Sequence, residues 1–398
     1  MIPIFDLHCH PSIKVYLCNA QIAKAHEPSS DFIPGGMHVD LPGMQIGGVQ
    51  CIVSFQYVPE VGITQMPLAH FAIDILKALH VDIVTKLQQD VDGNACFDQA
   101  MQGIQSLNAQ VTNATNFNVA LPTNLAEFNA AIAANQTIIL HGLEGSHHLG
   151  RNLGDPQNYL DNLQKFKDAG VNVLTLSHFF QNDVTGSGGG IPPQEAKMLG
   201  YKRTSLNVGL SAIGEQVINW CQDNGIIIDL VHSPVATRNR VYEILDERKA
   251  AGKRVRPIVF SHTGVRIMAT EKMFDQDDLR VLPAMEEVLK IRSYGGVLGM
   301  ILMNYWQTGE EDQDTILVND AGISFVIDTM KWIKELTRDV ANIAIGTDLD
   351  GFTTIPRDVR HVKFIDSLRQ AIIEAFGPDD AALICSGNVL RVLRDNFS

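Results

Sequence analysis

Residues 226–262 read IIIDLVHSPVATRNRVYEILDERKAAGKRVRPIVFSH, a stretch in which strand and helix patterns alternate. Two short apolar runs, at 226–232 and 258–262, lie on either side of a helical pattern at 235–251. Near-continuous apolar runs are typical of parallel strands that are covered on both faces. The stretch therefore predicts a strand, a helix and a second parallel strand, with a histidine at the end of each strand.

The same alternation extends along the whole chain. Eight apolar runs rich in β-branched residues occur at 2–10, 48–58, 137–144, 172–178, 226–232, 258–262, 296–303 and 342–348. Helical patterns occur at 67–89, 125–134, 156–169, 212–224, 235–251, 278–294 and 323–337. An α/β chain with eight such units favours a closed (β/α)8 TIM barrel, and an open doubly wound sheet is the alternative.

Three stretches exceed a simple connection between a strand and a helix: 11–45, 90–123 and 181–207. The first and third follow strands directly, so we expect these loop insertions to lie over the mouth of the barrel. The third contains a GSGGG run at 186–190, which predicts a flexible loop or lid because no helix begins directly after it. Two C-terminal helical segments, 357–376 and 378–397, complete a predicted single domain over residues 1–398.

The composition narrows the choice of partners. The chain has 31 basic and 45 acidic residues, a formal net charge of −14, and no run of Lys and Arg, so we expect no nucleic-acid partner. It has no basic leader with an apolar core and no apolar segment long enough to cross a bilayer, which predicts a cytoplasmic protein without a membrane partner. The six cysteines lack CxxC spacing and are expected to be reduced thiols.

Residues of metal-binding type end most of the predicted strands. The first strand ends at His8-Cys9-His10, and five others end at Glu144, His178, His232, His262 and Asp348. The C-terminal ends of barrel strands meet at one rim, where such enzymes carry their active sites. Because side chains alternate along a strand, His8 and His10 share a face that can chelate one ion. The histidines of the fifth and sixth strands can chelate a second ion, while the two carboxylates can supply a bridge and a further ligand.

Each of these residues also has a structural explanation. A lone histidine at a strand end is more often a hydrogen-bonded polar residue than a ligand, and only the coincidence at several strand ends favours a metal site. Structural roles are expected for His26, His38, His70, His80, His141, Asp6 and Asp350. His147 and His148, which follow Glu144 on a loop, fit either role.

The ordered series HCH, LEGSHH, LTLSH, GLSAIGEQVINWCQDNGIIIDLVHSP, PIVFSH and GTDLDG resembles the membrane (renal) dipeptidase family of the amidohydrolase superfamily. The resemblance runs from the first strand to the eighth. It implies a barrel with two divalent ions, Zn²⁺ in that family, and a homodimer. The implied ligands are His8 and His10 on one ion, His232 and His262 on the other, Glu144 as the bridge and Asp348 near both. His178 matches the family's histidine that faces the substrate carbonyl.

Two positions depart from the family pattern. The first motif of the family is usually His-x-Asp, whereas this chain has His10 in place of the aspartate, so the charge at that ion differs by one unit. The family's arginine that binds the substrate carboxylate has no secure match after His262. Arg266 and Lys272 are the candidates for that role.

The resulting hypothesis is a metal-dependent hydrolase of a dipeptide or related small amide. A metal-activated water attacks the carbonyl, His178 polarises it and Asp348 shuttles the proton. A lactam, an N-acyl amino acid or an ester is an alternative substrate for the same site. A non-catalytic metal-binding scaffold is the alternative from another class, and a dinucleotide-binding enzyme is set aside because no G-x-G-x-x-G follows the first strand.

Overall fold

The structure is a computed structural model, and it describes most of the chain. The described residues are 1–28, 36–60, 62, 92–191, 196–197, 200–202, 205, 207–266, 281–308, 314–315, 318–319, 323–351 and 356–397. The predicted helix at 67–89 and the candidate residue Lys272 lie outside them.

Eight parallel strands close into a barrel. They are β1 (Ile4–Cys9), β2 (Val49–Gln56), β4 (Thr137–Glu144), β5 (Val171–Thr175), β6 (Ile227–Asp229), β7 (Val259–Thr263), β8 (Val297–Met300) and β11 (Ile343–Ile345). The strand order is β2-β1-β11-β8-β7-β6-β5-β4, and pairing of β2 with β4 closes the ring. The (β/α)8 prediction is therefore confirmed, and each of the eight predicted runs overlaps a barrel strand.

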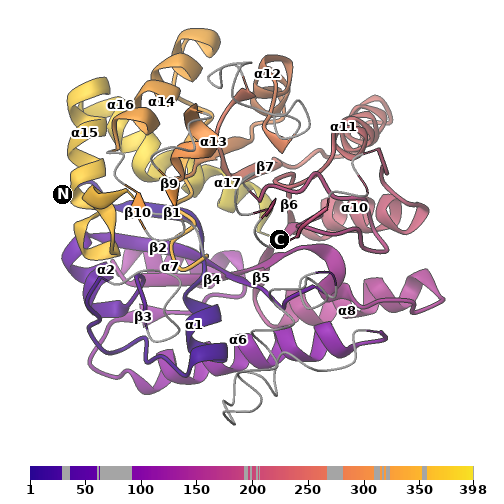
Figure 1. The fold of residues 1–398 in the computed structure, drawn as a ribbon, viewed down its shortest axis with the longest axis horizontal. Coiled ribbons are helices and arrows are strands. Elements are labelled where there is room, and N and C mark those ends of the chain that lie inside the picture. The colour runs from indigo at the N-terminus through magenta and orange to yellow at the C-terminus, as the bar shows by residue number, and fades with distance from the viewer. Residues whose placement is uncertain are drawn as a thin grey trace.

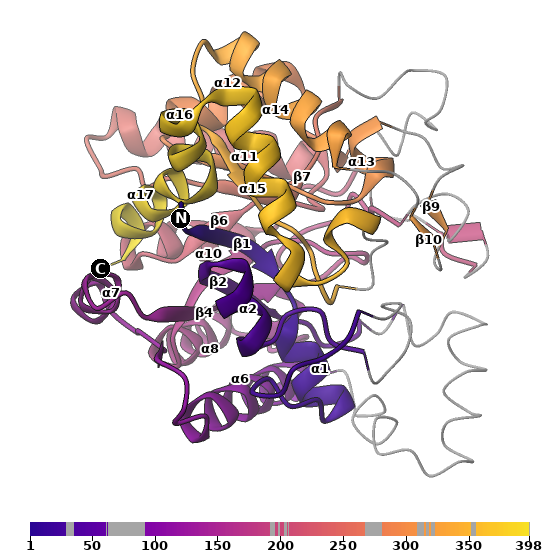
Figure 2. The same ribbon diagram turned by 90° about the vertical axis from the view of Figure 1, so that its left-hand side faces the viewer.

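Helices surround the barrel on all sides, and α6 and α14 lie on opposite sides of it in both views (Figures 1 and 2). Most predicted helices are present: α7 (Leu125–Ala133), α8 (Pro156–Asp168), α10 (Ala212–Asn224), α11 (Val235–Ala250), α12 (Met285–Ser293) and α14 (Ser324–Thr337). Among the residues described, α12 begins only after Pro283, where the side chain of Glu287 accepts a hydrogen bond from the N–H of Ala284.

The long insertions contain elements that the sequence analysis left unassigned. They are α1 (Pro11–Cys18), α2 (Leu41–Gly47), α6 (Ala95–Asn113) and the short strand β3 (Val119–Ala120). The buried face of α6 carries Phe97, Ala100, Ile104, Leu107 and Val111, whose spacing of three and four residues is a helical signal. A one-turn η1 (Ser146–Leu149), α13 (Asn304–Thr308) and a hairpin of β9 (Asp314–Thr315) and β10 (Val318–Asn319) complete the loops.

The C-terminal segment closes one end of the barrel. It comprises η4 (Arg357–Val359), η5 (Val362–Phe364), α15 (Asp366–Phe376), α16 (Pro378–Ala382), the π-helical turn η6 (Leu383–Gly387) and α17 (Asn388–Asn396). Val389, Val392 and Leu393 of α17 belong to the same buried cluster as Phe5 and Val259, which lie within the first two residues of β1 and β7. The opposite rim is formed by the C-terminal ends of the strands, and the buried polar residues that end the strands lie there. No helix in the described part of the chain is both long enough and apolar enough to span a bilayer.

Candidate active site

The carboxylate of Glu144, the last residue of β4, lies at the centre of a buried polar cluster at this rim. Five imidazoles face it. Their Nε2 atoms lie 3.4 Å (His8 and His10), 3.6 Å (His178), 3.7 Å (His232) and 3.8 Å (His262) from a carboxylate oxygen. The structure thus brings together histidines from the ends of β1, β5, β6 and β7.

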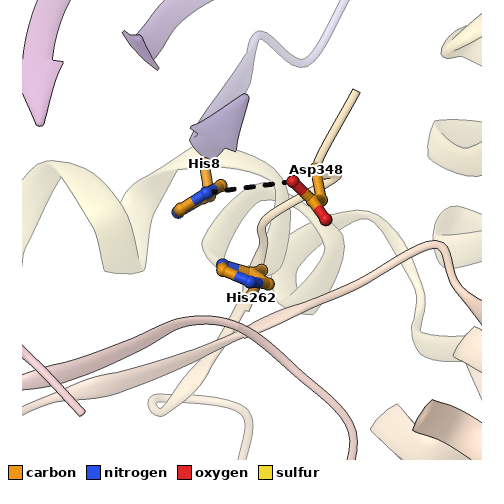
Figure 3. Close-up of side chains that lie close together, drawn as sticks. All are labelled: His8, His262 and Asp348. Carbon is orange, nitrogen blue, oxygen red and sulfur yellow. Dashed lines mark ion pairs between the residues drawn. The ribbon is translucent and has the colours of Figure 1, made fainter. Parts of the chain in front are cut away.

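Four of the imidazoles form two close pairs. The Nε2 atoms of His8 and His10 are 2.9 Å apart, and those of His232 and His262 are 3.2 Å apart. Asp348 adds a second carboxylate, whose Oδ1 lies 3.2 Å from His10 Nε2 and 3.9 Å from His8 Nε2. Figure 3 shows His8 at the end of its strand, facing Asp348, with His262 beside both.

Two of these residues have an unusual backbone. His232 and Asp348 each come three residues after the end of a strand, β6 and β11, and have φ angles of 60° and 58°. Left-handed backbone is uncommon for residues other than glycine and often marks functional sites. The turn there brings both side chains into the cluster, although their strands end early.

A second set of hydrogen bonds fixes how the rings present their nitrogens. His232 donates its Nδ1–H to the carbonyl oxygen of Gly189 (2.7 Å). Ser261 donates its hydroxyl proton to Asp229 Oδ2 (2.6 Å), so its oxygen can only accept from Nδ1 of His8 (2.8 Å) and of His262 (3.2 Å). In the neutral form, all three rings therefore direct an Nε2 lone pair towards the cluster.

The donor set fits bound cations. The paired Nε2 atoms of His232 and His262 are both acceptors at a distance of 3.2 Å, an arrangement that a shared cation would stabilise. Three groups have all their donor atoms within 4.8 Å of one another: His8, His262 and Asp348; His8, His10 and Glu144; and Glu144, His178 and His232. Because His178 appears in the third group, the division of ligands between two ions remains a prediction.

Burial and charge act in opposite directions on these groups. Burial lowers the pKa of His8 to about 3 and that of His232 to about 4, which keeps both rings neutral, as a ligand must be. Burial opposes ionisation of Glu144, but the neighbouring His178 and His10 hold its pKa well below its ordinary value. Although burial disfavours its charged form, His10 has a pKa raised to about 9 by Glu144 and Asp348.

The GSGGG run lies beside the histidines. Gly189 accepts the hydrogen bond of His232, and a side chain at Gly188 would come within 2.9 Å of the carbonyl oxygen of His232. Gly190 has a φ angle of +136°, and a Cβ there would lie 2.7 Å from Trp306. The segment predicted as a flexible loop or lid is therefore packed against the site, and its glycines allow the close approach.

Aromatic rings pack against the same histidines. Phe55 stacks on His8 with ring centroids 3.7 Å apart, and Trp306 stacks on His262 at 5.7 Å. Phe179 lies 3.7 Å from the ring of His178. These apolar contacts exclude water from the ring faces and strengthen the electrostatic interactions inside the cluster.

The other polar residues named from the sequence have structural contacts. Asp350 accepts the N–H groups of His38 and Val39, and His141 pairs with Asn108. His147 donates to the carbonyl of Val58, and His148 accepts the N–H of the same residue. His26 pairs with Asp40. His70 and His80 lie outside the described residues.

Of the two candidates for binding the substrate carboxylate, Arg266 lies among the described residues. Arg266 is half-buried, four residues after His262, and its N–H donates to the carbonyl of Pro283. Its role, like the ligand and catalytic roles above, stays a prediction. Three residues not predicted from the sequence support the cluster. Ser261 orients two rings and Glu60 binds Nδ1 of His178, whereas Asp229 acts through Ser261, from whose hydroxyl it accepts a hydrogen bond.

The sequence profile of the membrane dipeptidase family, peptidase family M19, matches residues 1–397. The chain belongs to this family. The resemblance inferred from the strand-end motifs is therefore confirmed, and a family of metallopeptidases accounts for a rim of buried histidines and carboxylates.

Known members of the dipeptidase family are distant relatives in sequence. Dipeptidase aclJ of Aspergillus oryzae is 24% identical over 257 residues, which cover 64% of this chain and 51% of that protein. Dipeptidase 3 of Rattus norvegicus is 25% identical over 256 residues, which cover 64% of this chain and 44% of that protein. The chain thus matches about half the length of these relatives.

The fold agrees with that of solved dipeptidase-family structures. A metallopeptidase from Rhodobacter sphaeroides, bound to a phosphinate mimic of the dipeptide L-Ala-D-Ala, superposes with a TM-score of 0.69 at 18% identity, covering 100% of this chain and 99% of that one. A probable dipeptidase from Pseudomonas aeruginosa superposes with a TM-score of 0.66 at 16% identity, covering 99% and 95%. At these identities the likeness establishes the barrel alone.

Proposed function

We propose that this chain is a metallo-dipeptidase that hydrolyses a dipeptide, or a related small amide, with two divalent ions, Zn²⁺ in the first instance. The observation that carries the proposal is the carboxylate of Glu144 among five imidazoles at the active rim of a dipeptidase-family barrel. The dipeptide mimic bound to the Rhodobacter relative supports a dipeptide as the substrate class.

The proposed ligands are His8 and His10 for one ion and His232 and His262 for the other, with Glu144 between them. When bound, such ions polarise a carbonyl and acidify a water to a pKa of about 7. The neutral rings of His8, His232 and His262 would offer Nε2 to the ions, since the Nδ1–H of each is already used elsewhere. With His10 in place of an aspartate, Glu144 and Asp348 remain the two acidic groups of the proposed set.

Two further residues handle the substrate in this proposal. Asp348 accepts the proton of the attacking water at Oδ1 and passes it to the leaving amine, an exchange of the kind that contributes about 10²–10⁴-fold in rate. His178 donates its Nδ1–H to Glu60 and directs Nε2 towards Glu144; burial disfavours its charged form, but these two carboxylates raise its pKa, and the doubly protonated ring donates its Nε2–H to the substrate carbonyl oxygen. Arg266 and Lys272 stay the proposed partners of the substrate carboxylate.

The test is a substrate panel combined with metal analysis. Purified protein loaded with Zn²⁺ or Mn²⁺ is assayed on L,L- and L,D-dipeptides, N-acyl amino acids, a lactam and an ester, while bound metal is counted by elemental analysis. We expect about two ions per chain and turnover of at least one dipeptide. Turnover restricted to a lactam, an ester or an N-acyl amino acid would replace the dipeptide. Bound metal without any turnover would favour a scaffold.

The proton role of Asp348 is tested separately. We expect Asp348→Asn to lower kcat by about 10²-fold or more, the usual effect of losing a general base, while the metal content is kept. Asp328→Asn is a matched control because that carboxylate is 61% exposed on α14. An unchanged kcat in Asp348→Asn would remove the proposed proton transfer. A cytoplasmic location and a homodimer stay predictions.

A further inference from the structure

Glu60 joins two loops of the rim. It lies four residues after β2, is 4% exposed, and directs its carboxylate entirely at the segment that follows β5. Oε2 accepts the Nδ1–H of His178 (2.9 Å) and the N–H of Phe179 (3.3 Å), and Oε1 accepts the N–H of Phe180 (3.0 Å). One buried carboxylate is therefore satisfied by three donors from consecutive residues.

The imidazole of His178 is held at one end by this contact and on its sides by other rings. Phe179 lies 3.7 Å from it between centroids, His232 4.6 Å and Tyr57 4.7 Å. With Nδ1 bound to Glu60, the other nitrogen, Nε2, is the atom that faces Glu144 Oε2 at 3.6 Å. Rotation of the ring about χ2 by half a turn would break the bond to Glu60 and remove Nε2 from the cluster.

A purely structural role is the simpler explanation, because Glu60 also accepts two backbone N–H groups. The backbone of the same loop, however, is already held by another side chain. Asn182 donates to the carbonyl of Leu176 and accepts from the N–H groups of Val184 and Thr185. Hydrogen bonds to ionised acceptors are about twice as strong as neutral ones, so a buried carboxylate beside an imidazole fixes that ring more firmly than an amide does.

We propose that Glu60 is a positioning residue that holds His178 with Nε2 directed at the substrate carbonyl oxygen. The inference rests on the proposed function for the role of His178. Its arrangement corresponds to the carboxylate–imidazole pair of acyl-transfer enzymes, in which the carboxylate orients the ring and stabilises its doubly protonated form without reacting itself. In that form Nε2–H can donate to a carbonyl oxygen. Here the carboxylate comes from the β2 loop and the ring from the β5 loop, so the pair also aligns two neighbouring strand ends.

The kinetic test is a double-mutant cycle of Glu60→Gln and His178→Ala in the metal-loaded enzyme, with Asn182→Ala as the control for the same loop. We expect Glu60→Gln to lower kcat about 10–100-fold, the range found when a partner that orients a functional histidine is removed. KM should change less than about threefold and the metal content should stay unchanged. In the His178→Ala background, Glu60→Gln should have almost no further effect on kcat, because its action passes through the ring. Additive losses would overturn the proposal.

A spectroscopic readout separates this proposal from the proposed function. A proton held between an imidazole and a carboxylate resonates far downfield, so full-length protein should show a His178 Nδ1–H signal that is lost in His178→Ala. The signal should disappear or move upfield in Glu60→Gln and remain in Asn182→Ala. A signal unchanged in Glu60→Gln refutes the positioning role. This holds even if the wild type hydrolyses none of the substrates tested.

Discussion

Replacing Ser261 by alanine should weaken both predicted metal positions at once. The serine hydroxyl accepts from Nδ1 of His8 (2.8 Å) and of His262 (3.2 Å) and donates to Asp229 Oδ2 (2.6 Å). The two histidines are the proposed ligands of different ions. A single buried hydroxyl therefore holds one ligand of each ion with Nε2 directed into the cluster.

The size of the effect follows from the bonds that are lost. Ser261→Ala leaves two buried Nδ1–H donors without a partner, and each unsatisfied buried donor costs about 1–3 kcal/mol. This free-energy cost falls on the neutral form of each ring with its proton on Nδ1, which is the form that binds a metal ion through Nε2. It is therefore measured as a loss of metal affinity. Removal of such an orienting partner weakens metal binding by about 10–100-fold, which equals about 1.4–2.7 kcal/mol at 1.36 kcal/mol per decade. We expect each of the two dissociation constants to rise within this range.

The assay is a titration of chelator-stripped protein with Zn²⁺ in competition with a chromophoric chelator. Ser293→Ala is the matched control, because the hydroxyl of this exposed serine only donates to a carbonyl within the last turn of α12. Circular dichroism of the metal-free proteins checks that the barrel is intact. An increase in only one dissociation constant, or in neither, would show that the serine does not orient both rings.

Three further predictions concern stability. Glu287→Gln should lower the free energy of unfolding by about 3–5 kcal/mol at pH 7, because it leaves the buried Arg238 without the carboxylate that accepts its Nε (2.7 Å) and Nη2 (3.0 Å). Burial opposes ionisation of Glu287, but Arg238 holds its folded-state pKa below the ordinary 4.5. The stability difference between the wild type and Glu287→Gln should therefore shrink as the pH falls from 4.5 through the folded-state pKa. A difference that stays constant with pH in denaturant titrations would contradict this prediction. Gly299→Ala should cost about 1–3 kcal/mol or more, since its Cβ would lie 1.9 Å from the carbonyl oxygen of Ser261, and calorimetry of the variant checks this. Chelation should lower the melting temperature and added Zn²⁺ should restore it, because ions bound only to the folded state stabilise that state; an unchanged melting temperature would argue against a bound ion.

The strands could be predicted from their apolar, β-branched runs, and six of the eight runs end at a residue of metal-binding type. The observed ends differ where the backbone turns: β6 stops at Asp229 and β11 at Ile345, three residues before His232 and Asp348. Both later residues have positive φ angles, which sequence periodicity does not reveal. The predicted ligands nevertheless meet, because the turn after each short strand returns the side chain to the rim.

The residues that orient the ligands were harder to find. Glu60 lies in a loop four residues beyond β2, and its relation to His178 is visible only once the barrel brings β2 and β5 to the same rim. Asp229 and Ser261 did leave a signal, as single polar residues inside the apolar runs IIIDLV and PIVFSH. A charged residue within a buried strand is costly unless it is hydrogen-bonded, so its presence there indicates a network.

Two such buried aspartates explain how very short strands can present ligands accurately. Asp6 accepts the N–H of His8 and both the N–H and the hydroxyl of Thr347, so it joins β1 to the turn that carries Asp348. Asp229 accepts the N–H of Ser261 and Val231 and the hydroxyls of Ser261 and Thr175.

Each carboxylate thus joins neighbouring strand ends by hydrogen bonds at the point where the ladder ends. Burial raises the pKa of Asp6 to about 6, but its hydrogen bonds to Thr347 and His8 oppose that shift and favour the ionised form. The strands β6 and β11 have only three residues each, so few ladder hydrogen bonds hold them. The positions of the residues that follow these strands therefore depend on the buried carboxylates of Asp6 and Asp229 as well as on the sheet.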